Sequence, residues 1–397
     1  MRLKTLDDVD VANKRVLVRV DFNVPMRDGK ITDTTRIDRA METLEELSSK
    51  GAKVVILSHF GRPKGEVFAD LSLKPIADAL AEISGKSVAF ADDCIGDVAK
   101  QTIDAAAWGS FIVLENVRFH PGEEKNLEVF AADLAANGDI FVSDAFSTAH
   151  RAHASIEGVA HILPSVAGRL MQTEIEALSG ALETPQNTVI EVVGGAKVST
   201  KMADLGPLTE KVDQIVIGGG MANTFLYANG IDIGKSLCEK EMADEARAIV
   251  EIAAKAGCEI VLPLDVVVAD AFAEGARSET VGLNDVPSDM MILDIGPKSI
   301  ADLQLRLKSA KTVLWNGPLG AFEVSPFDGG TNAVAKSVAE LTSAGQLLSV
   351  AGGGDTVSAL ANAGAKDGFS YVSSAGGAFL EWIEGKTLPG VAVIITE

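Results

Sequence analysis

The stretch AKVVILSHFGRPKG, residues 52–65, contains the pattern that decides the fold. An apolar run, residues 54–57, ends abruptly and is followed by His59, Arg62 and Lys64. A continuous apolar run is typical of a strand that is covered on both faces, as in a parallel sheet. The cationic side chains would then lie just beyond the carboxyl end of that strand.

Similar short runs recur along the chain and are separated by stretches with helical spacing. Two such stretches, residues 34–51 and 239–257, place apolar residues three or four positions apart and end at glycine. Strand and helix in alternation predict an α/β fold with mostly parallel sheets. The other predicted strands are RVLVRVDF (15–22), SFIVLENV (110–117), DIFVSDAF (139–146), TVIEVVGG (188–195), DQIVIGGG (213–220), EIVLPLDVVV (259–268), MMILDIG (290–296), KTVLWNG (311–317) and QLLSVAGGG (346–354).

About ten strands are many for one open sheet, so we expect two sheets in two domains. The 397 residues agree with this, at roughly 100–200 residues per domain. The predicted division lies near residues 161–182, where Pro164 and Gly168 break the pattern and an apolar helix follows.

The charge balance excludes some classes of partner. The chain carries 56 acidic against 35 basic residues, for a formal net charge of -21. Such a balance argues against nucleic acid and against an anionic membrane surface. No run approaches the ~18 apolar residues of a membrane span, and the start MRLKTLDDVDVANK shows no apolar leader. The 3 cysteines have no CxxC spacing, which favours reduced thiols and a cytoplasmic protein.

Polar residues follow each predicted strand of the first half. Ligands of open α/β sheets bind beyond the carboxyl ends of the strands, so these residues are candidates for a binding site. Arginines and a histidine from separate loops would suit a small polyanion that carries a phosphate and a carboxylate. Each arginine alone also fits a solvated or paired surface residue. The candidates are Asp21, Asn23, Arg36, His59, Arg62, Arg118 and Arg151, together with His120, His150 and His153.

The predicted strands of the second half end in glycine runs. In GGGDT, residues 352–356, three glycines allow the backbone to approach a ligand closely, and Asp355 and Thr356 resemble caps that open a helix. A helix start is an anion site, so several such loops predict a nucleotide with a phosphate tail. Tight turns and close helix–sheet contacts are the alternative explanation for any single run.

Familiar motifs for other chemistries fail on spacing. GGGMAN and GGGDTV do not complete the dinucleotide fingerprint GxGxxG. GIDIGKS (230–236) is one residue short of a Walker A loop, because position 229 is Asn. There is neither HExxH nor GxSxG, and His150 and His153 lack further plausible ligands. The spacing therefore predicts no built-in transition-metal site.

Eight segments in order along the chain resemble the phosphoglycerate kinase family. They are RVLVRVDFNVP (15–25), SHFGRPKG (58–65), ENVRFHPGEE (115–124), DAFSTAHRAHAS (144–155), GGAKVSTK (194–201), IGGGMANTFL (217–226), LWNGPLGAFE (314–323) and GGGDT (352–356). The resemblance implies two Rossmann-like three-layer α/β domains with parallel sheets, joined by a helix and hinge. It implies domain boundaries of 1–167, with the tail 385–397 packing on it, and 168–384, including the connecting helix 168–182.

The resemblance also implies an activity. The family moves a phosphoryl group between the acyl phosphate of 1,3-bisphosphoglycerate and ADP, giving 3-phosphoglycerate and ATP, and needs Mg²⁺. The family is usually monomeric. Carried onto this chain, the acid site comprises Asp21, Asn23, Arg36, His59, Arg62, Arg118 and Arg151. The nucleotide site comprises Lys197, Lys201, Asn316, Glu323, Gly353, Gly354, Asp355 and Thr356, with Glu323 on the ribose and Asp355 serving the metal–nucleotide complex.

To catalyse phosphoryl transfer, a protein must supply positioning and positive charge rather than covalent chemistry. We expect Arg36, Lys197 and Mg²⁺ to supply that charge, with Lys201 on the nucleotide phosphates. One substrate on each domain implies hinge closure that excludes water. Two other functions stay open: a nicotinamide-dependent dehydrogenase, and a protein that binds anions without catalysis.

Overall fold

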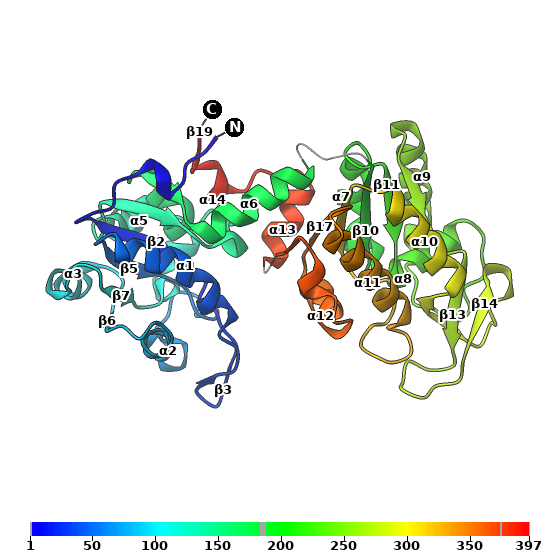
Figure 1. Cartoon of the computed structure of the whole chain (residues 1–397). Helices are drawn as coiled ribbons and strands as arrows, with labels where there is room; N and C mark the ends of the chain where they lie inside the picture. The colour runs from blue at the N-terminus through cyan, green and yellow to red at the C-terminus, as the bar shows by residue number, and fades with distance from the viewer. Residues whose placement is uncertain (1, 183–187, 374, 397) are drawn as a thin grey trace. The chain divides into compact units, whose positions relative to one another are not determined.

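The computed structural model describes residues 2–182, 188–373 and 375–396. The chain divides into two compact units, residues 1–176 with 387–397 (unit 1) and residues 177–386 (unit 2). Each unit is built around one six-stranded parallel sheet, and Figure 1 labels several of the strands and helices of each unit. The predicted α/β fold with two parallel sheets is confirmed.

In unit 1 the strands are arranged in the order β6-β7-β5-β2-β8-β9, and every neighbouring pair is parallel. Their carboxyl ends therefore lie along the same edge of the sheet. The bounds are β2 Arg15–Arg19, β5 Lys53–Leu57, β6 Val88–Ala91, β7 Phe111–Leu114, β8 Ile140–Ser143 and β9 Ser165–Ala167.

The sheet of unit 1 is covered on both faces. Val54 and Ile56 of β5 belong to a core shared with α1 (Thr35–Ser49) and α2 (Lys74–Ser84). Val55 and Leu57 belong to a second core, shared with α3 (Gly96–Ala105) and α5 (Glu128–Ala135). Successive side chains of a strand point to opposite faces, so a strand buried on both sides reads as a continuous apolar run.

Unit 2 has the strand order β12-β11-β10-β16-β17-β18, again with parallel neighbours. In chain order this is 3-2-1-4-5-6, the doubly wound arrangement, whose strand order reverses between β10 and β16. One face packs on α10 (Pro297–Ser309) and α11 (Gly329–Ser343). The strand bounds are β10 Val189–Val193, β11 Gln214–Ile217, β12 Glu259–Val261, β16 Thr312–Asn316, β17 Leu348–Ala351 and β18 Tyr371–Val372.

The expectation of one strand over residues 259–268 is wrong. The run divides into β12 and β13 (Asp265–Ala269), which belong to different sheets. Pro263 lies between them, and a proline cannot donate a ladder hydrogen bond. β13 instead pairs antiparallel with β14 (Ser278–Gly282) and β15 (Met291–Ile295). The predicted run 290–296 is thus also part of this small antiparallel sheet.

Both predicted helices are present, and each begins and ends within a few residues of the predicted positions. Residues 34–51 form α1, and residues 239–257 contain α9 (Ala243–Ala256) after a short 3₁₀ turn. Gly257 caps α9 with φ +80°, a conformation that only glycine adopts without strain. Among the described residues, no helix combines the length and apolar character that a bilayer crossing requires.

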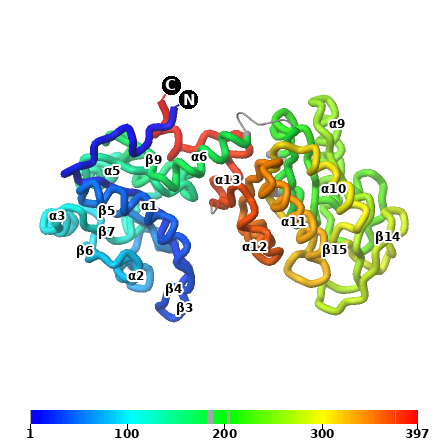
Figure 2. Tube along the Cα trace, in the orientation of Figure 1, coloured from blue at the N-terminus to red at the C-terminus, as the bar shows by residue number. Residues whose placement is uncertain are grey.

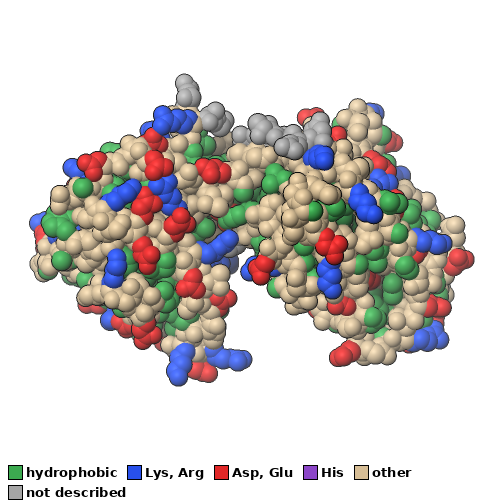
Figure 3. Space-filling view, in the orientation of Figure 1, with side chains coloured by type: hydrophobic (Ala, Val, Ile, Leu, Met, Phe, Trp, Pro, Cys, Tyr) green, Lys and Arg blue, Asp and Glu red, His purple; other side chains and the backbone are tan. Residues whose placement is uncertain are grey.

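The two ends of the chain lie side by side in unit 1. β1 (Arg2–Leu3) pairs antiparallel with β19 (Ile395–Thr396), and Figure 2 marks the N and C ends close together. A short helix, α14 (Pro389–Ala392), precedes β19. Acidic and basic side chains are interspersed over the face of each unit seen in Figure 3, so the net negative charge forms no single patch there.

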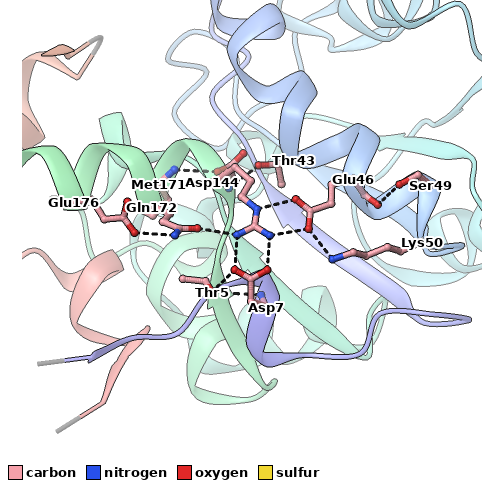
Figure 4. A network of polar contacts seen from close by, with 11 residues as sticks. Thr5, Asp7, Thr43, Glu46, Ser49, Lys50, Asp144, Met171, Gln172 and Glu176 are labelled. Atoms are coloured by element: carbon pink, nitrogen blue, oxygen red, sulfur yellow. Dashed lines mark hydrogen bonds and ion pairs between the residues drawn. The ribbon is translucent and has the colours of Figure 1, made fainter. Parts of the chain in front are cut away.

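Helix α6 (Arg169–Leu182) begins in a network of polar contacts within unit 1, drawn in Figure 4. Arg169 donates paired hydrogen bonds of 2.7 and 2.9 Å to Asp7 and of 2.7 and 2.8 Å to Glu46. The buried carboxylate of Asp144 accepts from Met171 N at 3.1 Å. Gly168 is required beside it, because a Cβ there would overlap the Asp144 carboxylate. This contact explains the break that Gly168 makes in the sequence pattern.

Candidate active site

Basic and polar side chains gather at the carboxyl edge of the unit 1 sheet. Asp21 follows β2, His59 follows β5, Arg118 follows β7 and Arg151 follows β8. These four strands are neighbours, so their loops meet at one edge. The charges of Arg118, Arg151 and Asp21 all act on His59, so the structure brings these four residues together.

Asp21 joins the loop after β2 to α1 and to the loop after β8. Its Oδ2 accepts hydrogen bonds from the Arg36 guanidinium and, at 2.5 Å, from Ser147 Oγ. Its Oδ1 accepts from Asn23 N at 3.0 Å. Burial raises the pKa of Asp21, but the charge of Arg36 and these hydrogen bonds lower it below its usual value. Asp21 is therefore ionised, and it positions Arg36.

His59 is held as a neutral ring. It is 3 % exposed, and Arg19 Nη2 lies 3.2 Å from its Nδ1. An arginine can only donate, so Nδ1 accepts and the ring proton is on Nε2. Burial lowers the pKa of His59 well below its usual value, and the charge of Arg19 lowers it further. The neutral imidazole thus offers an N–H donor.

Arg118 is anchored to the loop after β5. Its Nη1 donates to Gly61 O at 2.8 Å, and Asn23 Oδ1 accepts from Gly61 N at 2.9 Å. Burial and the charges of Arg19 and Arg151 lower the pKa of Arg118 to about 10, so it stays cationic at neutral pH. Arg62, directly after Gly61, is exposed, and Arg151 is half-buried. These contacts join the loops after β2, β5 and β7 into one rim of polar and basic side chains at the carboxyl edge of the sheet.

A buried layer beneath this rim was missed by the sequence analysis. Arg19 is 1 % exposed and donates from Nε to Ser155 Oγ at 2.8 Å. Ser155 in turn donates from Oγ and N to the fully buried Glu123, at 2.6 and 2.9 Å. Burial raises the pKa of Glu123, against the opposing charge of Arg19. In the sequence, the one indication of this buried layer was Arg19, which interrupts the apolar run RVLVRV.

In unit 2 the candidate residues meet where the strand order reverses. Val193 of β10 lies beside Asn316 of β16. Lys201 donates from Nζ to Gly194 O at 2.9 Å and to Asn316 O at 3.0 Å, so its ammonium spans the ends of both strands. Lys197 is exposed in the same loop, just before the 3₁₀ turn Val198–Thr200.

Some of the glycines serve packing rather than ligand approach. A Cβ at Gly194 would overlap Pro318 O, and one at Gly317 would overlap the backbone of Gly194. Gly317 also has φ +114°. The loops after β10 and β16 therefore interlock through bare backbone. Close backbone contact, rather than approach to a ligand, therefore explains why Gly194 and Gly317 are glycines.

The start of α12 (Gly354–Asn362) differs from the expected capping. Gly353, with φ +94°, is the N-cap, and no side chain caps the helix. Thr356 Oγ instead accepts from Gly317 N at 2.7 Å and joins this helix to the loop after β16. Gly354 has open space where a Cβ would be, and Asp355 is exposed in the first turn. First-turn amides without a capping side chain suit an anion.

A pocket of about 430 Å³ lies among these loops of unit 2. Gly195, Gly219 and Gly220 line it together with Glu323 and Asp355. The rest of its wall is largely apolar and includes Leu237, Phe272, Met291, Leu293 and Pro318. Lys201 and Asn316 line a separate pocket of about 200 Å³. A flat aromatic group with a phosphate tail matches the larger pocket in size and character.

A family model described as phosphoglycerate kinase matches residues 6–386. This chain belongs to the phosphoglycerate kinase family. It is 60 % identical over 395 residues to the phosphoglycerate kinase of Rhizobium meliloti, with 99 % of each chain covered. It is 59 % identical over 394 residues to the phosphoglycerate kinase of Rhodospirillum centenum, covering 99 % of this chain and 100 % of the relative.

Solved phosphoglycerate kinase structures share the fold. That of Coxiella burnetii has a TM-score of 0.93 at 44 % identity and covers 99 % of both chains. That of Pyrococcus horikoshii has a TM-score of 0.82 at 31 % identity, covering 99 % of this chain and 98 % of the other. The similarity to the phosphoglycerate kinase family predicted from the eight segments is therefore confirmed.

Proposed function

We propose that this chain catalyses the reversible transfer of a phosphoryl group between the acyl phosphate of 1,3-bisphosphoglycerate and ADP, giving 3-phosphoglycerate and ATP. As a member of its family it is a kinase of glycolysis and gluconeogenesis. The observation that carries the proposal is the basic rim of unit 1, where Asp21 holds Arg36 and where the charges of Arg118 and Arg151 act on the buried His59. Arginine forks and an N–H donor suit a small acid that carries a phosphate.

The acid would bind at the carboxyl edge of the unit 1 sheet. Arg118, Arg62 and Arg151 supply positive charge from three loops, and His59 supplies an N–H donor. Asp21 and Asn23 keep the rim in shape through Arg36 and Gly61. The proposed site is Asp21, Asn23, Arg36, His59, Arg62, Arg118 and Arg151.

The nucleotide would bind in unit 2, with its base against the apolar wall of the larger pocket. Glu323 at the pocket wall is suited to the ribose hydroxyls, and the first turn of α12 to the phosphates. Two main-chain oxygens orient the ammonium of Lys201. The proposed site is Lys197, Lys201, Asn316, Glu323, Gly353, Gly354, Asp355 and Thr356.

Asp355 fits a role in holding Mg²⁺ with the nucleotide. Its carboxylate is exposed in the first turn of α12 and lines the larger pocket. Mg²⁺ prefers oxygen ligands and is held in such sites by one or two carboxylates and substrate phosphates. When bound, it would supply positive charge to the phosphate oxygens.

The residues of this chain would act by position and charge. The attacking oxygen, from a carboxylate or from ADP, is already ionised, so the transfer needs no general base. Arg36 and Lys197 would place positive charge on the equatorial oxygens of the moving group, and Lys201 would hold the nucleotide phosphates. In-line transfer between groups held by two units calls for the hinge closure expected from the sequence.

A coupled assay with ATP and 3-phosphoglycerate tests the proposal directly. Consumption of 3-phosphoglycerate that requires ATP and Mg²⁺ is the expected result. Saturable NADH binding without such turnover would favour the dehydrogenase, and 3-phosphoglycerate binding without turnover would favour the anion-binding protein.

We propose a monomeric cytoplasmic enzyme whose partners are these small molecules, and a sedimentation experiment checks the monomer. We also propose that residues 1–167 with 385–397 bind the acid and residues 168–384 bind the nucleotide. In the whole chain, Arg118→Ala should weaken binding of 3-phosphoglycerate and leave binding of ADP unchanged, and Gly354→Ala should do the reverse.

A further inference from the structure

Three metal-ligating side chains meet at the edge of the unit 1 sheet. Asp93 and Cys94 follow β6, and His120 follows β7 after a 3₁₀ turn. β6 and β7 are parallel neighbours, so the loops after them lie at the same edge. A carboxylate oxygen of Asp93, Sγ of Cys94 and a ring nitrogen of His120 lie within 4.8 Å of one another.

Contacts with the rest of unit 1 hold this cluster in place. His120 Nε2 lies 2.7 Å from Asp93 Oδ1, which also accepts from Cys94 N at 2.6 Å. The His120 ring stacks on Phe130, with 5.0 Å between the ring centroids. Asn137 Nδ2 donates to Cys94 O at 2.9 Å. The three side chains therefore keep their places before any ligand arrives.

The cluster is open to solvent on one side and negative in character. Cys94 is 1 % exposed and forms the floor, whereas the side chains of His120 and Asp93 are 29 % and 41 % exposed. The charges that act most strongly on the thiol belong to Asp93, Glu123 and Glu115. A positive ion would be favoured here by charge and could enter from solvent.

We propose that Asp93, Cys94 and His120 bind a divalent transition cation of the zinc class. Thiolate, imidazole and carboxylate together suit Zn²⁺, while Mg²⁺ prefers oxygen ligands alone. Zinc–ligand distances of about 2.0–2.3 Å place neighbouring tetrahedral ligand atoms about 3.3–3.7 Å apart. The His120–Asp93 pair would open by about 0.6 Å, and the longer separations would close by up to about 1.3 Å. Three protein ligands leave a fourth position for water.

Such a site is separate from the proposed nucleotide–magnesium site of unit 2 and does not depend on it. Binding would displace the thiol proton of Cys94, while the neutral imidazole of His120 would keep one N–H, so binding should weaken as the pH falls. It would also tie the loop after β6 to the loop after β7, which carries Arg118. We therefore expect the cation to stabilise this edge of the sheet.

Co²⁺ is the probe, because a cobalt–thiolate bond absorbs in the near ultraviolet. We expect titration of the reduced, chelator-treated protein to produce this band with one Co²⁺ per chain, and Zn²⁺ to abolish it. Cys94→Ser should remove the band. His120→Asn and Asp93→Asn each remove one ligand and should weaken Co²⁺ binding by at least about tenfold, since loss of even an outer-shell partner typically costs about 10–100-fold.

Cys258→Ser is the matched control. Cys258 is also buried, and in the described ranges the group of metal-ligating residues does not include it. This variant should keep the band. If Cys94→Ser fails to fold, the more exposed His120→Asn still decides the question. No near-ultraviolet band in the wild type, or an unchanged band in Cys94→Ser and His120→Asn, would overturn the proposal.

Discussion

Arg19 Nη2 lies 3.2 Å from Nδ1 of His59, and both side chains are almost fully buried. Arg19 thereby sets the tautomer of His59, because the guanidinium has no acceptor. The same arginine reaches Glu123 through Ser155. A buried hydrogen-bonded network of Arg19, Ser155 and Glu123 thus positions the ring of His59 in the proposed acid site.

Arg19→Met should strongly destabilise the protein. Removing one member of a buried ionic network leaves Glu123 without its compensating charge, which typically costs about 3–5 kcal/mol. Urea unfolding measures this loss. The control is Arg15→Met at the start of the same strand, where the half-exposed pair with Asp139 is worth about 1 kcal/mol or less. Equal losses in the two variants would contradict a special role for Arg19.

Arg36→Ala should lower kcat by at least about 10²-fold, as loss of one preorganised donor to a charged transition state typically does. Asp21 holds this guanidinium at the rim. Steady-state kinetics with both substrates saturating is the measurement. Arg39→Ala, one turn further along α1, should have little effect. A kcat within threefold of wild type would remove Arg36 from the catalytic group.

Arg118→Ala should mainly weaken binding of 3-phosphoglycerate and change kcat less. The side chain is anchored on Gly61 O and keeps its charge at neutral pH. A loss of about one to two orders of magnitude in affinity is expected for a charged hydrogen bond of about 1.5–3 kcal/mol. Calorimetric titration measures it. An unchanged affinity would exclude Arg118 from the site.

Gly354→Ala should fold normally but bind ADP at least about tenfold more weakly, a loss of about 1.4 kcal/mol. A Cβ at Gly354 meets no other group in the protein, so only a ligand against the first turn of α12 would be displaced. Gly180→Ala, in α6, is the matched control, since its Cβ also has open space. Titration with ADP and thermal unfolding of both variants provide the comparison. Equal ADP affinity in the two would show that the nucleotide does not approach Gly354.

Asp144 should make stability fall as the pH rises from about 4 to about 7. Burial raises its pKa from 3.8 to about 7, although hydrogen bonds at the start of α6 oppose this. The folded state therefore holds the proton more tightly than the unfolded state. The resulting stability is fully present below pH 3.8 and is lost as the pH approaches 7, by up to about 1.4 kcal/mol per pH unit.

Asp144→Asn should remove this slope, which urea unfolding at several pH values between 4 and 7 would show. Asp139→Asn should change the pH dependence in the opposite sense. Hydrogen bonds from Arg15 lower the pKa of Asp139, so the stability that Asp139 contributes is lost as the pH falls. Parallel pH profiles for wild type and Asp144→Asn would contradict the prediction.

Local sequence patterns predicted the strands and helices more reliably than they predicted which strands pair with one another. Continuous runs such as residues 54–57 correctly indicated doubly covered parallel strands, because burial on both faces removes the alternation. The prediction of a single strand over residues 259–268 was wrong, because the apolar residues on either side of Pro263 have the same pattern whichever sheet they join. The short strands β6, β9 and β18 carried too little pattern to be predicted.

The amino-acid sequence alone determined that strands and helices alternate, that basic residues follow the strands of the first half and that glycines follow those of the second. These properties depend on neighbours along the chain. Only the tertiary structure decided that Arg19 orients His59, that Thr356 bonds to Gly317 and that Cys94 meets His120. The physical reason is that strand order joins residues far apart in the chain, and no local spacing records which strands become neighbours.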